Sequence, residues 1–586
     1  MTTATALTRL SPFEAVRLLR ADVPGKFVGD APDADDAQRF LLWWVLAGHR
    51  EYPAASAQAL TDAHKRWLFE PLAGFDARGG LGLNRLLQCL YSRRPDLAQA
   101  FEFRSPLGAW DAICWFYLTG VNELDLAPYL DDQTRAALSA PAFDAPGPQP
   151  SWLMFMLWRQ HAKLQEVFDL DSPKGRANFL VWFVRQGAEQ FGLKTLMGPA
   201  PVKAPPQASN ASGEFGVNLI GFAYGELGIG EDLRMAAQAL QAAGVPFRVL
   251  NIHAGDTVRQ ADKLVAEHVV NTAAELPYAI NVFCLTGFDT LRTYAEKGAE
   301  LFDGRHNIGW WPWELPVWPT RWAQAFDVID EVWAATTFTQ KMFAENTQKP
   351  VTLMPLPVSV QRLKKTSRRT LGLPAKQFLF LYVFDFNSYL ARKNPWAAID
   401  AFRRAFPADD KSVGLVLKTM NSRADNPQWD EFTRLCAADP RITLLQTTLD
   451  RGVVLGLVDA CDAYVSLHRS EGFGRTLAEA MLLGKPVVGT GFSGNADFLT
   501  AETGYPVKWK KCKVAEGEYA FVEPSDAAWW AEPDIAHAAR QMRAAREAAG
   551  SEWALQLPQQ VEEMFSPAHI GARMAGVLKE RFAALA

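Results

Sequence analysis

The sequence predicts an α/β protein with two parallel-sheet domains, preceded by an all-helical N-terminal domain. From about residue 215, short apolar runs alternate with amphipathic helical segments, once over 217–354 and again over 378–488. Such alternation is typical of βαβ units, whose strands run parallel. The first 196 residues lack this alternation, and there the apolar side chains recur at the helical spacings of three and four.

The length of the chain fits several domains. It has 586 residues, and one domain commonly has roughly 100–200. A stretch rich in Pro, Ala and Ser has the composition of an extended linker. The predicted parts are a helical repeat domain (1–196), this linker (197–214), an N-terminal α/β domain (215–363), a C-terminal α/β domain (364–550) and C-terminal helices (551–586).

Composition and charge argue against several classes of function. The net charge is −5 and no basic block occurs, so we expect no nucleic-acid partner. The six cysteines form no CxxC pair, and we interpret them as reduced thiols. The N-terminus lacks the features of a signal peptide. We therefore expect a cytoplasmic protein, with peripheral contact at the inner membrane face left open.

A repeat occurs in the helical region. The pattern W-[WF]-x-x-x-G-x-x-E starts at Trp43, Trp115 and Trp182, although the Glu of the third copy falls one place early. Stacked helical repeats would bury these aromatic residues as a core. The alternative is a platform that binds an acceptor or a partner protein. The nearby Asp169-x-Asp171 precedes Ser-Pro and is interpreted as part of a helix cap, not as a metal site.

The α/β elements follow in order along the chain. The first series of strands is predicted at 217–222, 247–251, 280–285, 307–311, 331–334 and 351–354. The second series is predicted at 378–384, 413–418, 442–445, 463–466 and 486–488. Helices near 394–405, 428–438, 450–459 and 474–483 separate the later strands, and 509–533 is expected to be an inserted loop or hairpin.

The most informative motif follows the strand at 463–466. Glu471 lies on the turn after this strand, and Glu479 lies eight residues later on the following helix. Gly472 and Gly474 allow a ligand to come close to the backbone. The helix N-terminus favours an anion, and carboxylates accept hydrogen bonds from pairs of sugar hydroxyls. The motif therefore predicts a ligand that carries both phosphates and hydroxyls.

These residues resemble a known family. The E-G-F-G-x-x-x-x-E element, the Ala-Met that follows it, the strand after Gly484 and the Ser493-Gly-Asn turn are similar to the E-x7-E signature of retaining glycosyltransferases of the GT-B fold, family 4 type. The resemblance covers roughly 215–580. It implies a GT-B fold, in which two Rossmann-like domains face each other across a cleft. It also implies a nucleotide-sugar-dependent hexosyltransferase.

The resemblance implies roles for the residues of this motif. Glu471 would contact hydroxyls of the donor sugar, and Glu479 would bind the ribose hydroxyls of the nucleotide. The backbone would supply the other donor contacts: Gly472, Phe473 and Gly474 against the sugar, Thr476 and Leu477 with amides toward the diphosphate, and Gly494 where the second turn passes the sugar.

The family also has a basic pair after the first strand of the second domain. Here Arg392 and Lys393 would stabilise the departing diphosphate, and with Glu471 they form the predicted catalytic group. The family often has an Arg directly after that strand, where this chain has Asp385. The alternative for the pair is solvated surface charge. Lys418 is a weaker candidate for a phosphate contact.

The first α/β domain is expected to bind the acceptor. The resemblance places Gly228 and Gly230 on the acceptor side, close to the donor phosphates. The run 310–314 is rich in Trp and follows a predicted strand, which brings Trp313 and Glu314 to the same edge. Tryptophan rings stack well on sugars, so acceptor binding is one interpretation and packing is the other.

The resulting hypothesis is a retaining glycosyltransferase without a cofactor or a required metal. Its donor would be a GDP-, UDP- or dTDP-sugar. Its acceptor would be a glycan, a lipid-linked molecule or a protein, in polysaccharide or lipopolysaccharide biosynthesis or in protein glycosylation. The helical domain would bind the acceptor or a partner protein. The alternative is a non-catalytic sugar-binding or scaffold protein that keeps the same fold.

Overall fold

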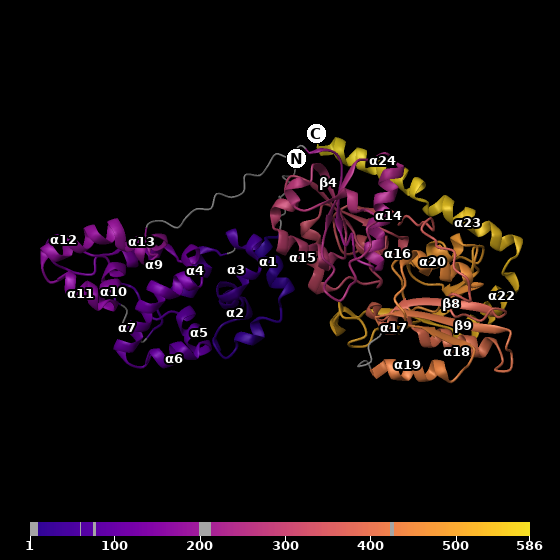
Figure 1. Ribbon diagram of the computed structural model, residues 1–586, viewed down its shortest axis with the longest axis horizontal. Coiled ribbons are helices and arrows are strands. Elements are labelled where there is room, and N and C mark those ends of the chain that lie inside the picture. The colour runs from indigo at the N-terminus through magenta and orange to yellow at the C-terminus, as the bar shows by residue number, and fades with distance from the viewer. Residues whose placement is uncertain (1–9, 59, 74–77, 198–212, 422–426, 586) are drawn as a thin grey trace. The chain divides into compact units, whose positions relative to one another are not determined.

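The computed structural model describes residues 10–58, 60–73, 78–197, 213–421 and 427–585. It divides into two compact units (Figure 1). The helical unit comprises Ser11–Gln207 with Tyr294–Ala299, and the α/β unit comprises Ala208–Thr293 with Glu300–Ala586. The predicted fold class is confirmed: a region of helices precedes the first strand, and two parallel sheets follow.

The N-terminal half of the α/β unit contains a seven-stranded sheet in the order β3-β2-β1-β4-β5-β6-β7, and every pairing in it is parallel. Its strands are β1 (Glu214–Gly221), β2 (Phe247–Asn251), β3 (Val269–Val270), β4 (Tyr278–Cys284), β5 (His306–Trp310), β6 (Glu331–Ala334) and β7 (Val351–Leu353). The helices of this half are α14 (Gly228–Ala242), α15 (Gly287–Lys297) and α16 (Thr337–Ala344).

The C-terminal half contains a six-stranded parallel sheet in the order β10-β9-β8-β11-β12-β13. Its strands are β8 (Phe378–Asp385), β9 (Val413–Met420), β10 (Ile442–Leu445), β11 (Ala463–Ser466), β12 (Val487–Thr490) and β13 (Tyr505–Val507). Its helices are α17 (Leu390–Lys393), α18 (Pro395–Ala405), α19 (Pro427–Ala437), α20 (Arg451–Ala460), α21 (Arg475–Leu482) and α22 (Ile535–Ala548).

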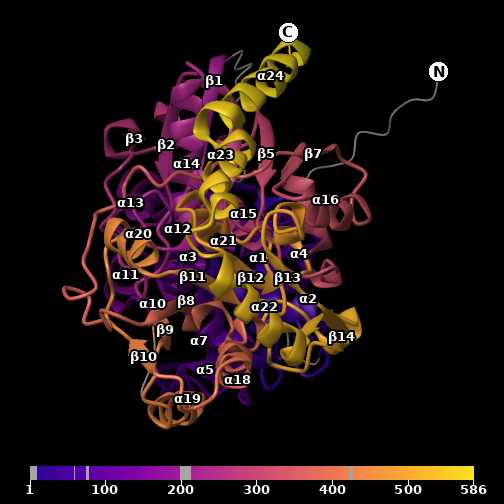
Figure 2. The same ribbon diagram turned by 90° about the vertical axis from the view of Figure 1, so that its right-hand side faces the viewer.

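Two further features complete this unit. The predicted insertion at 509–533 forms an antiparallel hairpin of β14 (Trp509–Lys513) and β15 (Trp529–Pro533). The helices α23 (Glu552–Phe565) and α24 (Pro567–Leu585) then lead the chain back to the first half, as Figure 2 shows in yellow. There α24 packs on α14, and a Cβ at Gly571 would lie 2.1 Å from the carbonyl oxygen of Ala239. The two halves are therefore tied together by the C-terminal helices.

The helical unit is built from short helices in three repeats. They are α1 (Pro12–Leu19), α2 (Asp36–Trp43), α3 (His49–Glu51), α4 (Asp62–Phe69), α5 (Arg85–Arg93), α6 (Pro95–Ala100), α7 (Pro106–Trp115), α8 (Val121–Glu123), α9 (Asp132–Ser139), α10 (Trp152–Gln160), α11 (Ala162–Val167), α12 (Pro173–Trp182) and α13 (Ala188–Gln190). Ser172 caps α12 by accepting a hydrogen bond of 3.0 Å from the Gly175 amide. This agrees with the interpretation of the Asp169-x-Asp171 stretch as part of a cap. Among the helices in the described ranges, none has the length and apolar character needed to cross a bilayer.

The repeated motif has a packing explanation. In each copy the chain makes a wider π-helical turn that ends at the motif glycine. A Cβ at Gly48 would come within 2.7 Å of the Trp43 ring, and a Cβ at Gly187 would come within 2.8 Å of the Trp182 ring. The glycine therefore leaves room for the tryptophan five residues before it, which is buried in the first copy and half-buried in the other two.

The motif glutamate pairs with an arginine in the first two copies. Arg94 stacks over Trp115 with its guanidinium carbon 5.4 Å from the ring centre, and it forms an ion pair with Glu123. The first copy repeats this arrangement with an arginine over its own tryptophan. The third copy has His161 in place of the arginine, and there Glu189 forms an ion pair of 3.0 Å with Lys194 instead.

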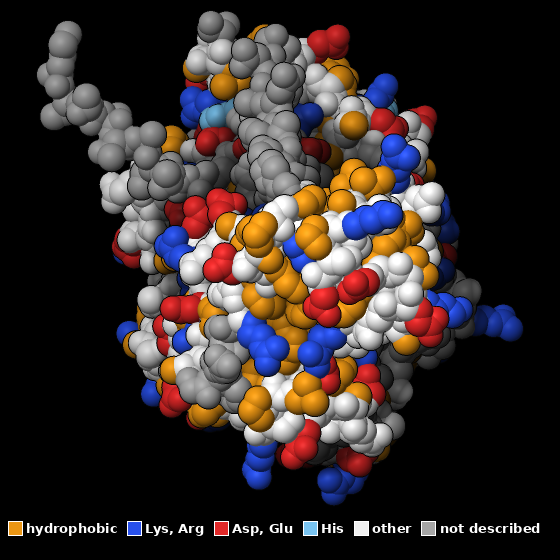
Figure 3. Space-filling view, turned by 90° about the vertical axis from the view of Figure 1, so that its left-hand side faces the viewer, with side chains coloured by type: hydrophobic (Ala, Val, Ile, Leu, Met, Phe, Trp, Pro, Cys, Tyr) orange, Lys and Arg blue, Asp and Glu red, His pale blue; other side chains and the backbone are white. Residues whose placement is uncertain are grey.

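The third repeat ends the array with an exposed apolar surface. Val181 and Val184 are 53% and 65% exposed, whereas Cys114 and Tyr117, at the same positions of the second copy, are buried. Figure 3 looks onto the end of the helical unit that carries α11 and α12, where hydrophobic side chains lie among lysines and arginines. The difference follows from position in the array, because none of the described residues forms a further repeat that stacks on the last one.

Candidate functional site

The predicted corner between β11 and α21 has the geometry of an anion site. β11 ends at Ser466, and α21 begins at Arg475. Gly474 precedes the helix with a φ of 93°, a conformation that glycine adopts without strain. Of the described contacts of α21, none gives the Arg475 or Thr476 amide a backbone acceptor, and the helix dipole adds a partial positive charge there. This end of the helix can therefore hold a phosphate group.

Two glycines let neighbouring turns touch at this corner. A Cβ at Gly494 would lie 2.0 Å from the carbonyl oxygen of Gly472. A Cβ at Gly472 would lie 2.7 Å from the carbonyl oxygen of Trp313, which belongs to the N-terminal half. Close backbone packing therefore accounts for both glycines, and the carboxyl ends of the two sheets meet here.

The three predicted catalytic side chains come together. Arg392 donates to Glu471 Oε2 over 3.2 Å and to the Ser470 carbonyl over 2.9 Å, and Lys393 forms an ion pair with Glu471 Oε1. The side chains of Arg392 and Lys393 are only 5% and 16% exposed. The alternative of solvated surface charge is therefore wrong.

The neighbouring cations hold Glu471 ionised at neutral pH. Burial raises the pKa of Glu471, but Lys393 and Arg392 outweigh it and bring the pKa to about 2. Burial lowers the pKa of Lys393, as does the neighbouring Arg392, while Glu471 raises it. Glu471 is therefore ionised at pH 7 and acts as a hydrogen-bond acceptor, not as a proton donor.

Glu479 has one oxygen available for a ligand. Its side chain is 1% exposed and lies on α21, where Oε1 pairs with Arg451. Within the described chain, Oε2 is buried without a hydrogen-bond partner. Burial raises the pKa of this carboxyl, while Arg451 and Arg475 lower it. A buried acceptor without a partner is costly, so a hydroxyl donor at this oxygen would be favourable.

Carboxylates of the N-terminal half pair with arginines of the C-terminal half. Arg475 donates to Asp232 Oδ1 over 2.5 and 3.1 Å, and Arg451 donates to Glu231 Oε1 over 3.3 Å. The sequence interpretation missed all four residues. The sequence did contain a signal for Arg451, because this residue opens the helix that follows β10. The carboxyl ends of parallel strands lie at the same edge of a sheet, where ligands bind.

A tyrosine of the insertion also reaches the site. Tyr519 is 3% exposed and donates to Glu314 Oε2 over 2.5 Å. Glu314 Oε1 lies 3.5 Å from Arg392, so Tyr519 joins the chain of charges that ends at Glu471. The Tyr389 ring centre lies 4.6 Å from that of Tyr519. The sequence interpretation missed Tyr519, because the connection between the two strands of the hairpin, where it lies, carries no motif.

The structure places the predicted acceptor residues around α14 and β5. Gly228 opens α14, and a Cβ at Gly230 would lie 2.4 Å from the carbonyl oxygen of Gly225, so Gly230 serves close packing. The Trp313 ring is 6% exposed, donates to the Val317 carbonyl over 2.8 Å and packs 4.9 Å from Trp318. These contacts agree with the packing interpretation of Trp313.

The remaining residues that were predicted to bind the donor make contacts within the protein. The Leu477 amide donates to the Gly474 carbonyl over 3.0 Å, and the Thr476 hydroxyl accepts from Tyr464 over 2.9 Å. Phe473 is 5% exposed and packs on Phe498. Lys418 is buried at the end of β9, where its ammonium donates to the Thr419 carbonyl over 3.0 Å.

His468 connects the corner to a neighbouring turn. It is fully buried, with Nδ1 2.9 Å from the Ser466 hydroxyl and Nε2 2.9 Å from Asn495 Oδ1. Because both ring nitrogens have partners, His468 connects β11 to the turn that contains Gly494. Burial lowers its pKa to about 4, so it is neutral at pH 7.

Comparison with known families agrees with this geometry. Residues 384–518 match the family model described as "Glycosyl transferases group 1". This segment contains the Glu471–Glu479 corner and the Arg392-Lys393 pair. The expected glycosyltransferase domain is therefore confirmed for this part of the chain. No curated protein matches the sequence.

Solved structures with a similar backbone are distant relatives in sequence. Anabaena Alr3699/HepE in complex with UDP is 15% identical, with 62% of this chain and 100% of that chain covered and a TM-score of 0.45. Sucrose-phosphate synthase from Thermosynechococcus elongatus is 16% identical, with 63% and 100% covered and a TM-score of 0.48. The lipopolysaccharide outer core galactosyltransferase WaaB is 14% identical, with 62% and 99% covered and a TM-score of 0.43. Similarity this low supports no statement about substrates.

Proposed function

We propose that this protein is a retaining glycosyltransferase that transfers a sugar from a nucleotide-sugar donor to a glycan, lipid-linked or protein acceptor. The observation that carries the proposal is the β11–α21 corner. There Glu471 lies against Arg392 and Lys393, and Glu479 offers a buried oxygen, without a partner among the described residues, beside a helix N-terminus. The family match of residues 384–518 to glycosyltransferases supports it.

The proposed donor contacts divide between the two acids. Glu479 Oε2 accepts a hydrogen bond from a ribose hydroxyl, and the amides that open α21 bind the diphosphate. Glu471 accepts from hydroxyls of the transferred sugar. A nucleoside diphosphate sugar spans these three subsites, because its diphosphate joins the ribose to the sugar.

In the proposed reaction, an acceptor hydroxyl oxygen forms a bond to the anomeric carbon as the bond from that carbon to the diphosphate oxygen breaks. The proton of the hydroxyl passes to the departing diphosphate. Arg392 and Lys393 stabilise the charge that develops on this leaving group. Because Glu471 is held ionised by the same two cations, it positions the sugar and does not supply a proton. The proposal includes no metal ion, since these side chains and the α21 amides supply the positive charge.

A screen with nucleotide sugars tests the proposal. The full chain would be mixed with UDP-, GDP- and dTDP-sugars, and both the thermal shift and the release of nucleoside diphosphate would be measured with and without EDTA. We expect one nucleotide to raise the melting temperature and its sugar to be hydrolysed slowly, with EDTA having no effect. A non-catalytic scaffold protein would bind without hydrolysis, and failure of all three nucleotides to bind would overturn the proposal.

A further inference from the structure

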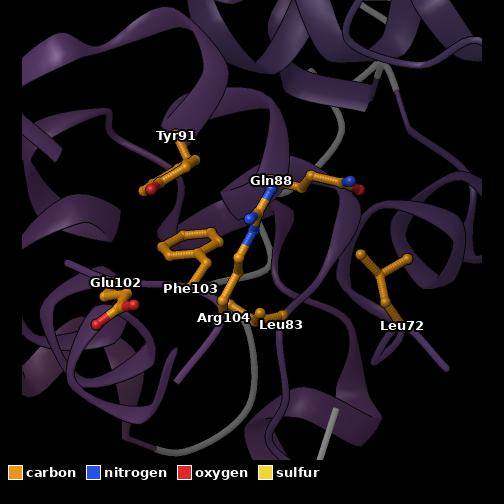
Figure 4. Close-up of a pocket in the computed structure, with 7 residues that line it drawn as sticks. All are labelled: Leu72, Leu83, Gln88, Tyr91, Glu102, Phe103 and Arg104. Atoms are coloured by element: carbon orange, nitrogen blue, oxygen red, sulfur yellow. The ribbon is translucent and has the colours of Figure 1, made fainter. Parts of the chain in front are cut away.

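A pocket of about 450 Å³ opens in the second repeat of the helical unit. It lies where α5 and the segment between α6 and α7 meet the loop after α4 (Figure 4). The residues that line it are Leu72, Leu83, Gln88, Tyr91, Glu102, Phe103 and Arg104. Its volume falls within the range of about 300–1,000 Å³ that is typical of small-ligand sites.

The third repeat has different residues at the positions that correspond to this lining. The two repeats correspond at a constant offset of 67 residues, since α5 begins at 85 and α10 at 152, and α7 begins at 106 and α12 at 173. At this offset Gln88 corresponds to Phe155, which stacks with Trp158 at 6.0 Å. Phe103 corresponds to Leu170, which is 2% exposed. The third repeat thus has an apolar side chain, Phe155, at the position where the second repeat has the polar Gln88 beside the pocket.

The lining combines an aromatic surface with polar groups. The rings of Tyr91 and Phe103 stack with centres 3.8 Å apart and planes 25° apart. Arg104 extends toward Gln88 in Figure 4. Gln88, Glu102 and Arg104 are exposed, and in the described part of the chain their side chains make no hydrogen bond or ion pair with other residues. Their donors and acceptors are therefore available to a ligand.

These features fit a sugar better than an anion or an apolar molecule. Aromatic faces pack against the C–H faces of sugar rings, while amide, guanidinium and carboxylate groups bond to neighbouring hydroxyls. One carboxylate and one guanidinium cancel in charge, so the lining does not select a phosphate. We propose that this pocket binds a sugar unit of the acceptor glycan, an inference that rests on the proposed glycosyltransferase function and narrows its acceptor to a carbohydrate.

The pocket gives the helical unit a role in acceptor capture. A glycan held there is tethered to the same chain as the transferase corner, which raises its local concentration at that corner. Acceptors long enough to reach both places gain from the tether, whereas short acceptors do not. The effect of the pocket is therefore expected in KM for long acceptors and not in kcat.

The test uses the full chain on a glycan array, with two matched variants. Gln88→Phe introduces the residue of the third repeat and is expected to fill the pocket without unfolding the helix. Gln99→Phe makes the same change at an exposed position of α6 outside the pocket. We expect wild type and Gln99→Phe to bind the same glycans, and Gln88→Phe to bind them at least tenfold more weakly. Arg104→Ala provides a second, smaller change at the pocket.

Several outcomes would overturn the inference. They are a wild type that binds no glycan on the array, a Gln88→Phe variant that binds as well as wild type, and capture of peptides at this pocket in place of glycans. The thermal shift with the nucleotide would be measured on the same samples. An intact shift together with absent glycan binding rejects the pocket alone, whereas an absent shift in wild type rejects the glycosyltransferase proposal.

Discussion

The two halves of the α/β unit share a parallel architecture, but in three ion pairs between them at the site the N-terminal half supplies the acids and the C-terminal half the arginines. The N-terminal half brings the carboxylates of Glu231, Asp232 and Glu314 to its edge. The C-terminal half meets them with Arg451, Arg475 and Arg392, one arginine for each acid. Each arginine that faces an acid of the first half lies beside the proposed donor subsites. The C-terminal half therefore supplies the cations for the donor, and acids of the N-terminal half help to hold these cations in place.

This comparison explains why only one half carries a recognisable motif. Glu471, Glu479 and the basic pair are specified within one domain, so their spacing along the chain records the geometry of one strand-to-helix corner. Two acids of the N-terminal half lie 220 and 243 residues from their arginines, since Arg451 pairs with Glu231 and Arg475 with Asp232. Residues that meet across two domains have no characteristic separation along the chain, so they form no recognisable motif.

The largest expected effect comes from removing a cation of the C-terminal half. Arg392→Ala should lower the turnover number by about 10²- to 10³-fold, because a preorganised charge at the leaving group is lost. The measurement is the rate of nucleoside diphosphate release at saturating donor. Lys510→Ala, at an exposed position of β14, is the control and should leave the rate unchanged. A change of less than threefold in Arg392→Ala would remove this residue from the catalytic group.

The second expected effect is a loss of stability of the C-terminal half as the pH falls. The pKa of His468 is about 4 when folded and 6.5 in its ordinary state, so between these pH values the unfolded chain binds the extra proton. Stability from this histidine is complete above pH 6.5 and is lost as the pH falls toward 4, by about 3 kcal/mol in total. Urea unfolding of the α/β unit, followed from pH 7 to 4, measures the loss.

His468→Gln should flatten this pH dependence, whereas His253→Gln, at an exposed position of the N-terminal half, should keep it. Glu471 and Glu231 have pKa values of about 2, so their contribution is lost only below about pH 4.5. Equal slopes in wild type and His468→Gln between pH 6.5 and 4.5 would show that the histidine is not the responsible group.

A smaller effect is expected where the insertion touches the N-terminal half. Tyr519→Phe removes the hydrogen bond to Glu314 and should lower kcat/KM for the acceptor about tenfold, as for a bond to a charged group. Donor hydrolysis in the absence of acceptor should change less than twofold. Tyr505→Phe is a matched control on β13. An equal loss in both reactions would assign Tyr519 to the fold and not to the acceptor side.

The smallest effect should have the opposite sign. Asp232→Asn weakens the pair with Arg475, which frees this arginine for the donor diphosphate. We expect the nucleoside diphosphate to bind about threefold more tightly while the melting temperature falls. Calorimetric titration and a thermal scan measure the two quantities, with the exposed Asp256→Asn as the control. Weaker binding by Asp232→Asn would mean that the acid supports the site instead of competing for its cation.

Much of the fold could be predicted because strands and helices leave local patterns. β2, β6, β10 and β11 occupy the predicted residues, and α18 to α21 lie within one residue of their predicted bounds at most positions. The short strands were missed for local reasons: β3 has two residues, and β13 contains Pro506. Their position at a sheet edge depends on neighbours that no local pattern describes.

The candidate site could be predicted only in part. In the structure Glu471, Arg392 and Lys393 all follow strands that are adjacent in the sheet, and the sequence grouped them through its resemblance to a known family. It did not reveal Tyr519, which reaches Glu314 from an insertion more than 200 residues away. Nor did it show that close backbone packing, with or without a ligand, already requires Gly494. Side-chain direction and contacts between domains were the missing information.

The account rests on Glu479 as the acceptor for the nucleotide, and calorimetric titration tests this most directly. The nucleoside diphosphate selected in the donor screen would be titrated into wild type, Glu479→Gln and the exposed control Glu562→Gln. We predict that Glu479→Gln binds at least 30-fold more weakly, equivalent to about 2 kcal/mol, while the control matches wild type. Equal affinities in wild type and Glu479→Gln would contradict the account.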